Sequence, residues 1–207
     1  MFFRKLKGFT ILELLVSSTV ILILFSFVLA SFRTGRYSGE INVVTKQIIS
    51  GITIARTKTL GGEIFQSGFP AGGYGINFDA REPSQYILFA DTDDNGSFTG
   101  DVSDPGGSTE TIEVGSFRDI SIVSVCGLDA NQVLELPCTG SGWSTITSPF
   151  FLEIIFTEPG QIAVNYANPQ PGDSFDFVGL QVRHQKTGQE AYIYVSILSG
   201  LVTGDLY

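Results

Sequence analysis

The longest apolar stretch of the chain covers residues 9–32, where Glu13 is the only ionisable side chain. A helix of this length spans about 36 Å, which exceeds the roughly 30 Å hydrocarbon core of a bilayer. Arg4, Lys5 and Lys7 precede the stretch, and a basic flank of this kind stays on the cytoplasmic side of a membrane. The pattern predicts a transmembrane helix over residues 9–32, with the rest of the chain outside the cytoplasm.

A different hydrophobic period follows this stretch. Apolar residues recur at spacings of three or four, the period of one face of an α-helix. They are Ile41, Val44, Ile48, Ile52 and Ala55. Lys46, Ser50 and Thr53 lie off this stripe, and Gly61-Gly62 provides a stop. The spacing predicts that an amphipathic helix continues over residues 33–60 and packs its stripe on a sheet.

Alternation of apolar and polar residues dominates the remaining chain and predicts β-strands. The expected strands cover residues 75–78, 86–90, 110–114, 120–125, 150–156, 162–166, 179–184 and 191–198. Glu158-Pro159-Gly160 and Lys186-Thr187-Gly188 each place turn residues between two expected strands, which predicts two hairpins. The predicted fold class is therefore α+β: a long N-terminal helix packed on an antiparallel β-sheet domain of residues 61–207.

Charge is distributed unevenly along the chain. The net charge is −9, and beyond Lys58 only four basic residues stand against nineteen acidic ones. Phosphate binding requires clustered lysines and arginines, so this acidic domain argues against a nucleic-acid platform. The basic residues between Arg33 and Lys58 are better placed to meet lipid head groups or acidic neighbours.

An ordinary secretory signal is the alternative to a retained transmembrane helix. The basic start, the apolar run and Val28-Leu29-Ala30 before Ser31 match a cleavable signal of that kind. However, the apolar run is longer than the about 7–15 residues usual for such signals. Glu13 lies near its start, and a carboxylate in a bilayer core costs roughly 2.5–3.5 kcal/mol on insertion scales. An acid at this position therefore predicts a function and a partner.

The residues around Glu13 resemble the prepilin signal of type IV pilins and type II secretion pseudopilins. The matching run is Lys7-Gly8-Phe9-Thr10-Ile11-Leu12-Glu13-Leu14-Leu15. The resemblance implies that a prepilin peptidase removes the leader, residues 1–8, by cutting between Gly8 and Phe9, and that Phe9 is then N-methylated. Because the cut creates an amino group at Phe9, the Glu13 carboxylate of one subunit can pair with that amine of a neighbour.

The same resemblance gives the expected partners and location. It implies a structural, non-enzymatic subunit of a pilus or pseudopilus that starts in the inner membrane with a single span. Its partners would be other pilin or pseudopilin subunits, the prepilin peptidase, the inner-membrane assembly platform and membrane lipid. Further likenesses to H-type minor pseudopilins and minor pilins are residues 52–58, Phe89-Ala90-Asp91 with Asn95-Gly96, Phe156 with Gly160, and residues 196–200. A DNA-uptake minor pilin is the alternative within the family, and the acidic domain disfavours it.

An acid-rich loop follows the expected strand over residues 86–90. Its oxygen ligands, with a glycine that permits a bend, are typical of calcium loops. The candidate ligands are Asp91, Asp93, Asn95 and Asp101. Val102 stands where an EF-hand has its bidentate glutamate. The run therefore predicts either a weak calcium site or a polar β-turn built on its Asn-Gly pair.

Three further side chains bear on chemistry. Cys126 and Cys138 are the only cysteines, and a disulfide between them is expected outside the cytoplasm, with two buried thiols as the alternative. His184 is the only histidine, and no nucleophile motif lies near it, so no catalytic triad is predicted. Zinc needs three or four nitrogen or sulfur ligands, and one histidine with two cysteines does not readily supply them. An enzyme with an ordinary signal peptide is the remaining alternative, and the chain has neither a P-loop nor a dinucleotide fingerprint.

Overall fold

The computed structural model describes residues 10–66, 68–105, 108–128, 143–147, 151–157, 160–166 and 176–206. The chain divides into two compact units, Met1–Gly39 and Glu40–Tyr207. The helix α1 (Ile11–Leu60) has residues in both units. Its last part, from Glu40 onward, therefore belongs to the same unit as the strands.

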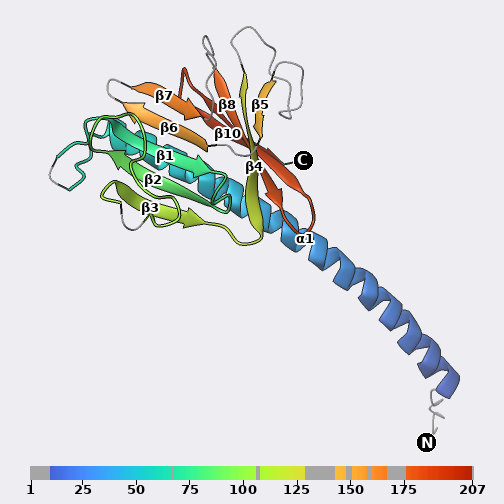
Figure 1. The fold of residues 1–207 in the computed structure, drawn as a ribbon. Coiled ribbons are helices and arrows are strands. Elements are labelled where there is room, and N and C mark those ends of the chain that lie inside the picture. Colours follow the sequence, from blue (N-terminus) through green and yellow to red (C-terminus); the bar gives the residue numbers. More distant parts are fainter. Residues whose placement is uncertain are drawn as a thin grey trace, which may run out of the picture. The chain divides into compact units, whose positions relative to one another are not determined.

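Ten strands follow α1 in the described part of the chain, and both sheets that they form are visible in Figure 1. The strands are β1 (Gly73–Asp79), β2 (Gln85–Asp91), β3 (Thr111–Ser116), β4 (Ile120–Leu128), β5 (Trp143–Thr147), β6 (Phe151–Thr157), β7 (Gln161–Tyr166), β8 (Phe177–His184), β9 (Glu190–Ser196) and β10 (Val202–Leu206). The first sheet has the order β3-β2-β1-β6-β7 and the second the order β10-β9-β8-β4-β5. Every pairing is antiparallel.

The predicted α+β class is confirmed, and so is the antiparallel pairing. Each expected strand overlaps an observed one, and both expected hairpins form, because β6 pairs with β7 and β8 with β9. The turn residues Gly160 and Gly188 have φ of 88° and 71°. Glycine adopts this left-handed region without a steric cost, so the turn sequences identified the hairpins for the right physical reason.

Two features of the sheets differ from the prediction. The strands form two sheets instead of one, and neither β5 nor β10 has a counterpart among the expected strands. β10 contains Gly204 and Asp205, residue types that are depleted in strands, so its own sequence signal is weak. Its pairing with β9 makes it a strand, and this tertiary effect is not encoded in the local pattern.

The C-terminus of α1 lies at Leu60, before the predicted glycine stop. The N–H of Gly61 donates to the carbonyl of Thr57 at 2.8 Å, and the N–H of Glu63 donates to the carbonyl of Lys58 at 3.0 Å. Gly62 has a φ of 58°. A left-handed glycine with such backward bonds satisfies the last carbonyl groups of a helix, which explains why the helix ends there.

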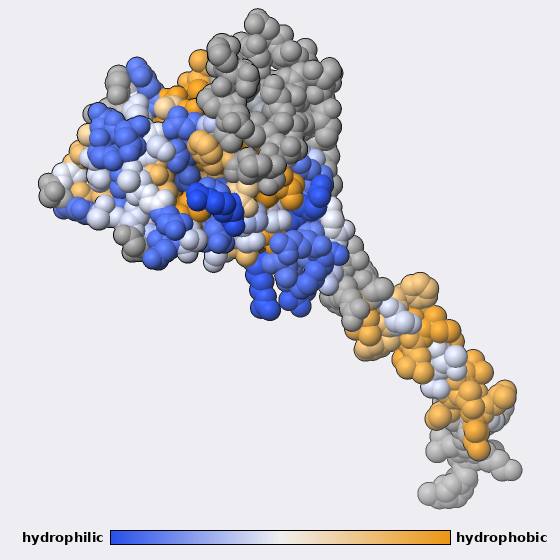
Figure 2. Space-filling model, in the orientation of Figure 1, coloured by the Kyte–Doolittle hydropathy of each residue, from blue (hydrophilic) through white to orange (hydrophobic). Residues whose placement is uncertain are grey.

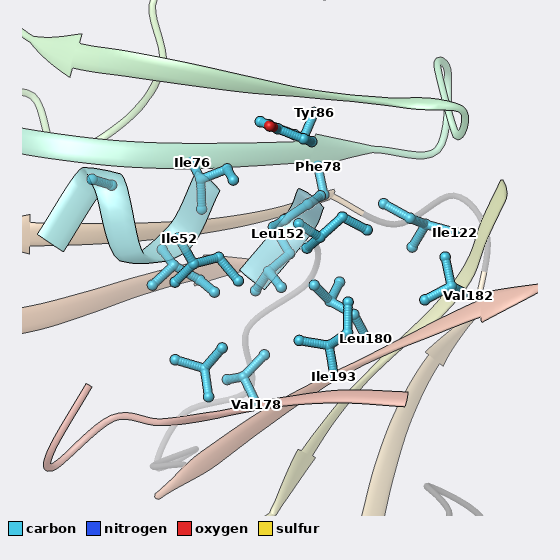
Figure 3. Packing of buried hydrophobic residues seen from close by; sticks show 14 of the residues in the cluster. Ile52, Ile76, Phe78, Tyr86, Ile122, Leu152, Val178, Leu180, Val182 and Ile193 are labelled. Atoms are coloured by element: carbon cyan, nitrogen blue, oxygen red, sulfur yellow. The ribbon is translucent and has the colours of Figure 1, made fainter. Parts of the chain in front are cut away.

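The apolar stripe of α1 is buried, as its spacing predicts. Ile48, Ile52 and Ala55 have no exposed surface, and Ile41 and Val44 are nearly inaccessible. The five side chains share one core cluster with residues of both sheets. Figure 3 shows Ile52 within this cluster, together with side chains from the two sheets. The helix therefore contributes the hydrophobic face that the β-rich unit needs to form a common core.

Two further contacts connect α1 with the first sheet. A Cβ atom at Gly51 would lie 3.0 Å from the ring of Tyr86 and 3.2 Å from the side chain of Ile76, so glycine lets the helix approach β1 and β2 closely at this point. Near the end of the helix, the hydroxyl of Thr59 donates to the carbonyl of Phe156 at 2.9 Å and accepts from the N–H of Tyr74 at 3.3 Å. This buried hydroxyl thereby bonds to both β6 and β1.

Replacing Ile52 by alanine tests the importance of the stripe. We expect Ile52→Ala to lower the free energy of unfolding by about 2–5 kcal/mol, because it leaves a cavity in a closed core. Ile54→Ala is the matched control on the same helix, since Ile54 is 38% exposed, and should cost less than about 1 kcal/mol. Denaturant unfolding of the full chain in detergent, followed by Trp143 fluorescence, measures both. Equal losses would contradict this view of the core.

Candidate functional site

The first unit carries a long apolar helical surface. The part of α1 from Ile11 to Leu29 is long and apolar enough to cross a membrane, and none of it is buried. Leu12 is 77% exposed and Phe27 is 72% exposed, and Figure 2 shows apolar residues along this segment. In water such a surface is unfavourable, so the segment needs lipid or other apolar helices around it. A signal sequence near the N-terminus passes the same test of length and composition, so the polar residues of the segment have to distinguish between the two.

The one charged residue of this segment lies at the N-terminal start of the helix. The N–H of Glu13 donates to the hydroxyl oxygen of Thr10 at 3.2 Å, and that hydroxyl lies 3.5 Å from the Glu13 carboxylate. The residue spacing is that of a capping box, with threonine at the N-cap and glutamate at the third helical position, and the bond from the Glu13 N–H to the threonine hydroxyl is one of its two bonds. The carboxylate is also favoured there by the helix dipole. Glu13 therefore has a local role in starting the helix.

Sequence reasoning missed this capping role, although the spacing Thr-x-x-Glu before an apolar run is its signal. The contact with Thr10 satisfies part of the carboxylate's hydrogen-bonding capacity, and among the described residues no cation lies within 4.0 Å of it. The predicted cleavage and methylation residues, Gly8 and Phe9, lie outside the described residues. The structure thus places Glu13 and leaves the other two positions as sequence predictions.

A second candidate site lies in the β-rich unit and consists of three carboxylates. Oxygen atoms of Asp91, Asp93 and Glu110 lie within 4.8 Å of one another, and we refer to these residues as the acidic cluster. Asp91 ends β2, and Glu110 immediately precedes β3. The two antiparallel strands bring these residues together, since the N–H of Ala90 donates to the Glu110 carbonyl at 2.9 Å. This arrangement can hold a metal ion.

The acidic cluster differs from the ligand set that the sequence predicted. Asp91 and Asp93 belong to it, but Glu110 occupies the place expected for Asp101. The carboxylate of Asp101 instead accepts hydrogen bonds from the N–H and hydroxyl of Ser103, at 3.0 and 2.8 Å. A contiguous-loop pattern could not include Glu110, because strand pairing and not sequence proximity brings it to the site.

The predicted ligand Asn95 acts as a donor that closes the loop. Its N–H donates to Asp91 at 3.2 Å, and its side-chain amide donates to Asp93 at 2.9 Å. The N–H of Gly96 donates to the other oxygen of Asp91 at 2.8 Å. The alternative interpretation of this run, a polar turn around the Asn-Gly pair, is therefore also present in the structure, and the turn forms one wall of the acidic cluster.

The electrostatics of the acidic cluster favour a cation. Burial raises the pKa of Asp91, and nearby Asp93 raises it further. Burial likewise raises the pKa of Glu110, and repulsion from Asp93 and Asp91 adds to the effect. Backbone N–H groups of Thr92 and Thr99 bind Glu110 at 3.2 and 2.6 Å and oppose this shift. Ionised carboxylates are costly at such close range without a counter-charge.

A fourth carboxylate, Glu153 of β6, holds the acid-rich loop on the first sheet. Glu153 is 2% exposed and accepts hydrogen bonds from the Asn77 amide at 2.9 Å, the Phe98 N–H at 3.0 Å and the Ser97 hydroxyl at 2.8 Å. These donors compensate its charge. Sequence reasoning missed Glu153, and its signal is a lone acid within the otherwise apolar strand Phe151–Thr157.

The remaining candidate residues, a cysteine and a histidine, both make contacts that support the fold. Cys126 is buried and disulfide-bonded, and the chain's other cysteine, Cys138, lies outside the described residues. His184 is also buried, with Nε2 3.2 Å from the carboxylate of Glu40 and Nδ1 accepting the N–H of Lys186 at 3.2 Å. The Nε2 contact connects β8 to α1, and the Nδ1 contact is local to the turn that follows β8.

Comparisons of the chain with protein-family models, with curated proteins and with solved structures find no match. Conclusions about function therefore depend on two sets of groups. One is the apolar helix with Glu13 at its start, and the other is the acidic cluster. The apolar helix is the more informative of the two. Its surface requires lipid or other apolar helices around it, whereas the acidic cluster requires only a positive charge.

Proposed function

We propose that this chain is a structural subunit of a type IV pilus or of a type II secretion pseudopilus. The observation that best supports this function is an exposed apolar helix with one carboxylate, Glu13, in its first turn. The preceding residues Lys7, Gly8 and Phe9 match a prepilin cleavage signal. An ordinary membrane anchor has no use for an acid at this depth, whereas a subunit that pairs with its neighbour does.

The physical argument for assembly concerns the charge of Glu13. The capping contact with Thr10 orients the carboxylate but does not neutralise it. In an apolar bundle an unpaired carboxylate is strongly unfavourable. Cleavage after Gly8 would create an amine at Phe9, and pairing that amine with Glu13 of a neighbouring subunit offsets the cost and fixes the register between helices. Insertion into a filament then depends on processing.

The proposed location is the inner membrane, with the β-rich unit on the far side from the cytoplasm. The disulfide of Cys126 supports this placement, because disulfides persist in oxidising compartments outside the cytoplasm. The partners would be other pilin or pseudopilin subunits, the prepilin peptidase, the assembly platform and membrane lipid. A minor subunit of the H-type is the favoured subclass, supported by the likenesses in residues 52–58 and 196–200.

We also propose that the acidic cluster binds calcium. Carboxylate oxygens are the ligands that Ca²⁺ prefers, and its flexible coordination tolerates an irregular set of them. Asp91 and Glu110 are nearly inaccessible to solvent, so a bound cation would relieve a repulsion that solvent screens poorly. By joining the end of β2 to the start of β3, the ion would stabilise the acid-rich loop on the first sheet.

Processing is tested by the mass and N-terminal sequence of the protein recovered from membranes. We expect a chain that begins at N-methylated Phe9, because the leader is cut at Gly8. A chain that begins at Ser31 would identify the apolar helix as a discarded signal and would overturn the filament proposal. An uncut chain from a strain that has an active prepilin peptidase would contradict it as well.

The role of Glu13 is tested by Glu13→Gln. Glutamine still fits the third position of a capping box, so membrane insertion should be unchanged. Incorporation into filaments should fall by more than about tenfold, because the neighbour's amine loses its partner. Thr10→Ala is the matched control, since it removes the cap and keeps the charge, and it should retain most incorporation. Quantitative blotting of sheared filaments measures both, and normal incorporation of Glu13→Gln would refute the pairing.

Calcium binding is tested by thermal unfolding of the full chain in detergent, with calcium or with chelator. At about 100 times its Kd, calcium should stabilise the fold by about 2.7 kcal/mol, a shift in Tm of roughly 5–10 °C. Asp93→Asn and Glu110→Gln should abolish the shift, whereas Asp101→Asn should retain it. Loss of the shift in Asp101→Asn alone would favour the ligand set predicted from the sequence over the acidic cluster.

A further inference from the structure

The pair Asn95-Gly96 lies in the acid-rich loop that follows β2, and it is the only asparagine-glycine pair of the chain. Asn95 is exposed, and a Cβ atom at Gly96 would have no neighbour within 4 Å. A glycine lets its own backbone nitrogen approach the preceding side chain closely, because it has no Cβ atom. The pair therefore has the composition and the space for an intramolecular reaction, the deamidation of Asn95.

Deamidation of this pair needs no reagent other than water. The backbone nitrogen of Gly96 loses its proton to a solvent base and forms a bond to Cγ of Asn95. The bond from Cγ to Nδ2 then breaks, and the amide nitrogen takes a proton from water and leaves as ammonia. Water opens the resulting succinimide ring at one of its two carbonyl groups. The product is aspartate or isoaspartate, and nothing is oxidised or reduced.

The folded loop holds the attacking nitrogen in a hydrogen bond. The N–H of Gly96 donates to a carboxylate oxygen of Asp91 at 2.8 Å, and Asp91 has no exposed surface. Removal of the proton would leave a negative nitrogen next to a buried carboxylate, and like charges repel strongly where solvent screens them poorly. The carbonyl of Gly96 also accepts a hydrogen bond from the side-chain amide of Asn165. The closed loop therefore keeps the nitrogen protonated and in place.

The side chain that would be attacked is held as well. Oδ1 of Asn95 accepts the N–H of Ser97 at 2.8 Å. Nδ2 of Asn95 donates to the carboxylate of Asp93 at 2.9 Å and to the hydroxyl of Thr99 at 2.6 Å. Movement of Cγ toward the Gly96 nitrogen breaks these bonds, and each hydrogen bond contributes to keeping the side chain where it is. Both partners of the reaction are thus restrained by the same loop.

We infer that Asn95 is a deamidation site that the hydrogen bond from Gly96 to Asp91 protects while the acid-rich loop is closed. Local opening of the loop frees the Gly96 nitrogen, and Asn95 then converts to aspartate or isoaspartate. The conversion replaces the amide that donates to Asp93 by a carboxylate that repels it, so the closed loop does not re-form as before. This inference depends on neither filament assembly nor calcium binding.

The rate of conversion in the folded and in the unfolded protein tests the inference. The full chain in detergent is incubated at neutral pH with a calcium chelator, with and without urea that unfolds the β-rich unit. Peptide mass spectrometry follows aspartate and isoaspartate at position 95. We expect the folded protein to convert at least about tenfold more slowly, because the reaction has to wait for the loop to open. Equal rates in the two samples, or no conversion of the unfolded chain, would overturn the inference.

Three variants locate the protection. Asp91→Asn should speed conversion of the folded protein several-fold, because it removes the carboxylate that holds the Gly96 N–H. Thr99→Val removes an acceptor of the Asn95 amide at an exposed position and should also speed it with little effect on Tm. Asp101→Asn is the matched control, since Asp101 bonds to Ser103 instead. In urea all three should convert like the parent. Parent-like folded rates in Asp91→Asn and Thr99→Val, or an equal rise in Asp101→Asn, would refute the protection.

Discussion

Burial of the apolar stripe of α1 is the interaction on which the β-rich unit depends. Ile48 and Ile52 lie in one cluster with side chains from both sheets, and no strand pairing joins the two sheets among the described strands. The helix therefore supplies a hydrophobic surface that the sheets share. Gly51 and Thr59 add a close approach and a buried hydrogen bond to the first sheet. A single amphipathic segment thus serves as the centre of a core that neither sheet completes alone.

Buried carboxylates organise the polar side of the same unit, and they fall into two kinds. Glu153 is compensated by four protein donors, one of them the amide of Asn165, and fixes the acid-rich loop to β6. Asp91 and Glu110 also accept backbone hydrogen bonds, but they share their surroundings with Asp93 and with each other. Glu153 is therefore a structural acid, whereas Asp91 and Glu110 belong to a candidate metal site. Their hydrogen bonds leave negative charge that a cation can compensate.

Two charged residues of α1 lie beside exposed apolar surface. Glu13 lies on an exposed apolar helix, and Arg56 lies beside exposed leucines. In each case a charged group and an exposed apolar surface occur together, and this arrangement does not stabilise an isolated chain. Association removes the apolar surface from water and supplies the opposite charge at once. Each feature is therefore better suited to contact with an apolar environment than to exposure in water.

The sequence by itself determined the elements that have a local cause. The apolar run, the stripe from Ile41 to Ala55 and the glycine after Leu60 specify the helix and its end, and alternation with turn glycines specifies eight strands and two hairpins, because these signals reside in neighbouring residues. Only the tertiary structure decided the rest. β10 is a strand because β9 pairs with it, Glu110 joins Asp91 because β2 and β3 are antiparallel neighbours, and Arg56 meets the turn at Gly200 across most of the chain's length. Each of these depends on contacts between distant residues, which a local pattern does not contain.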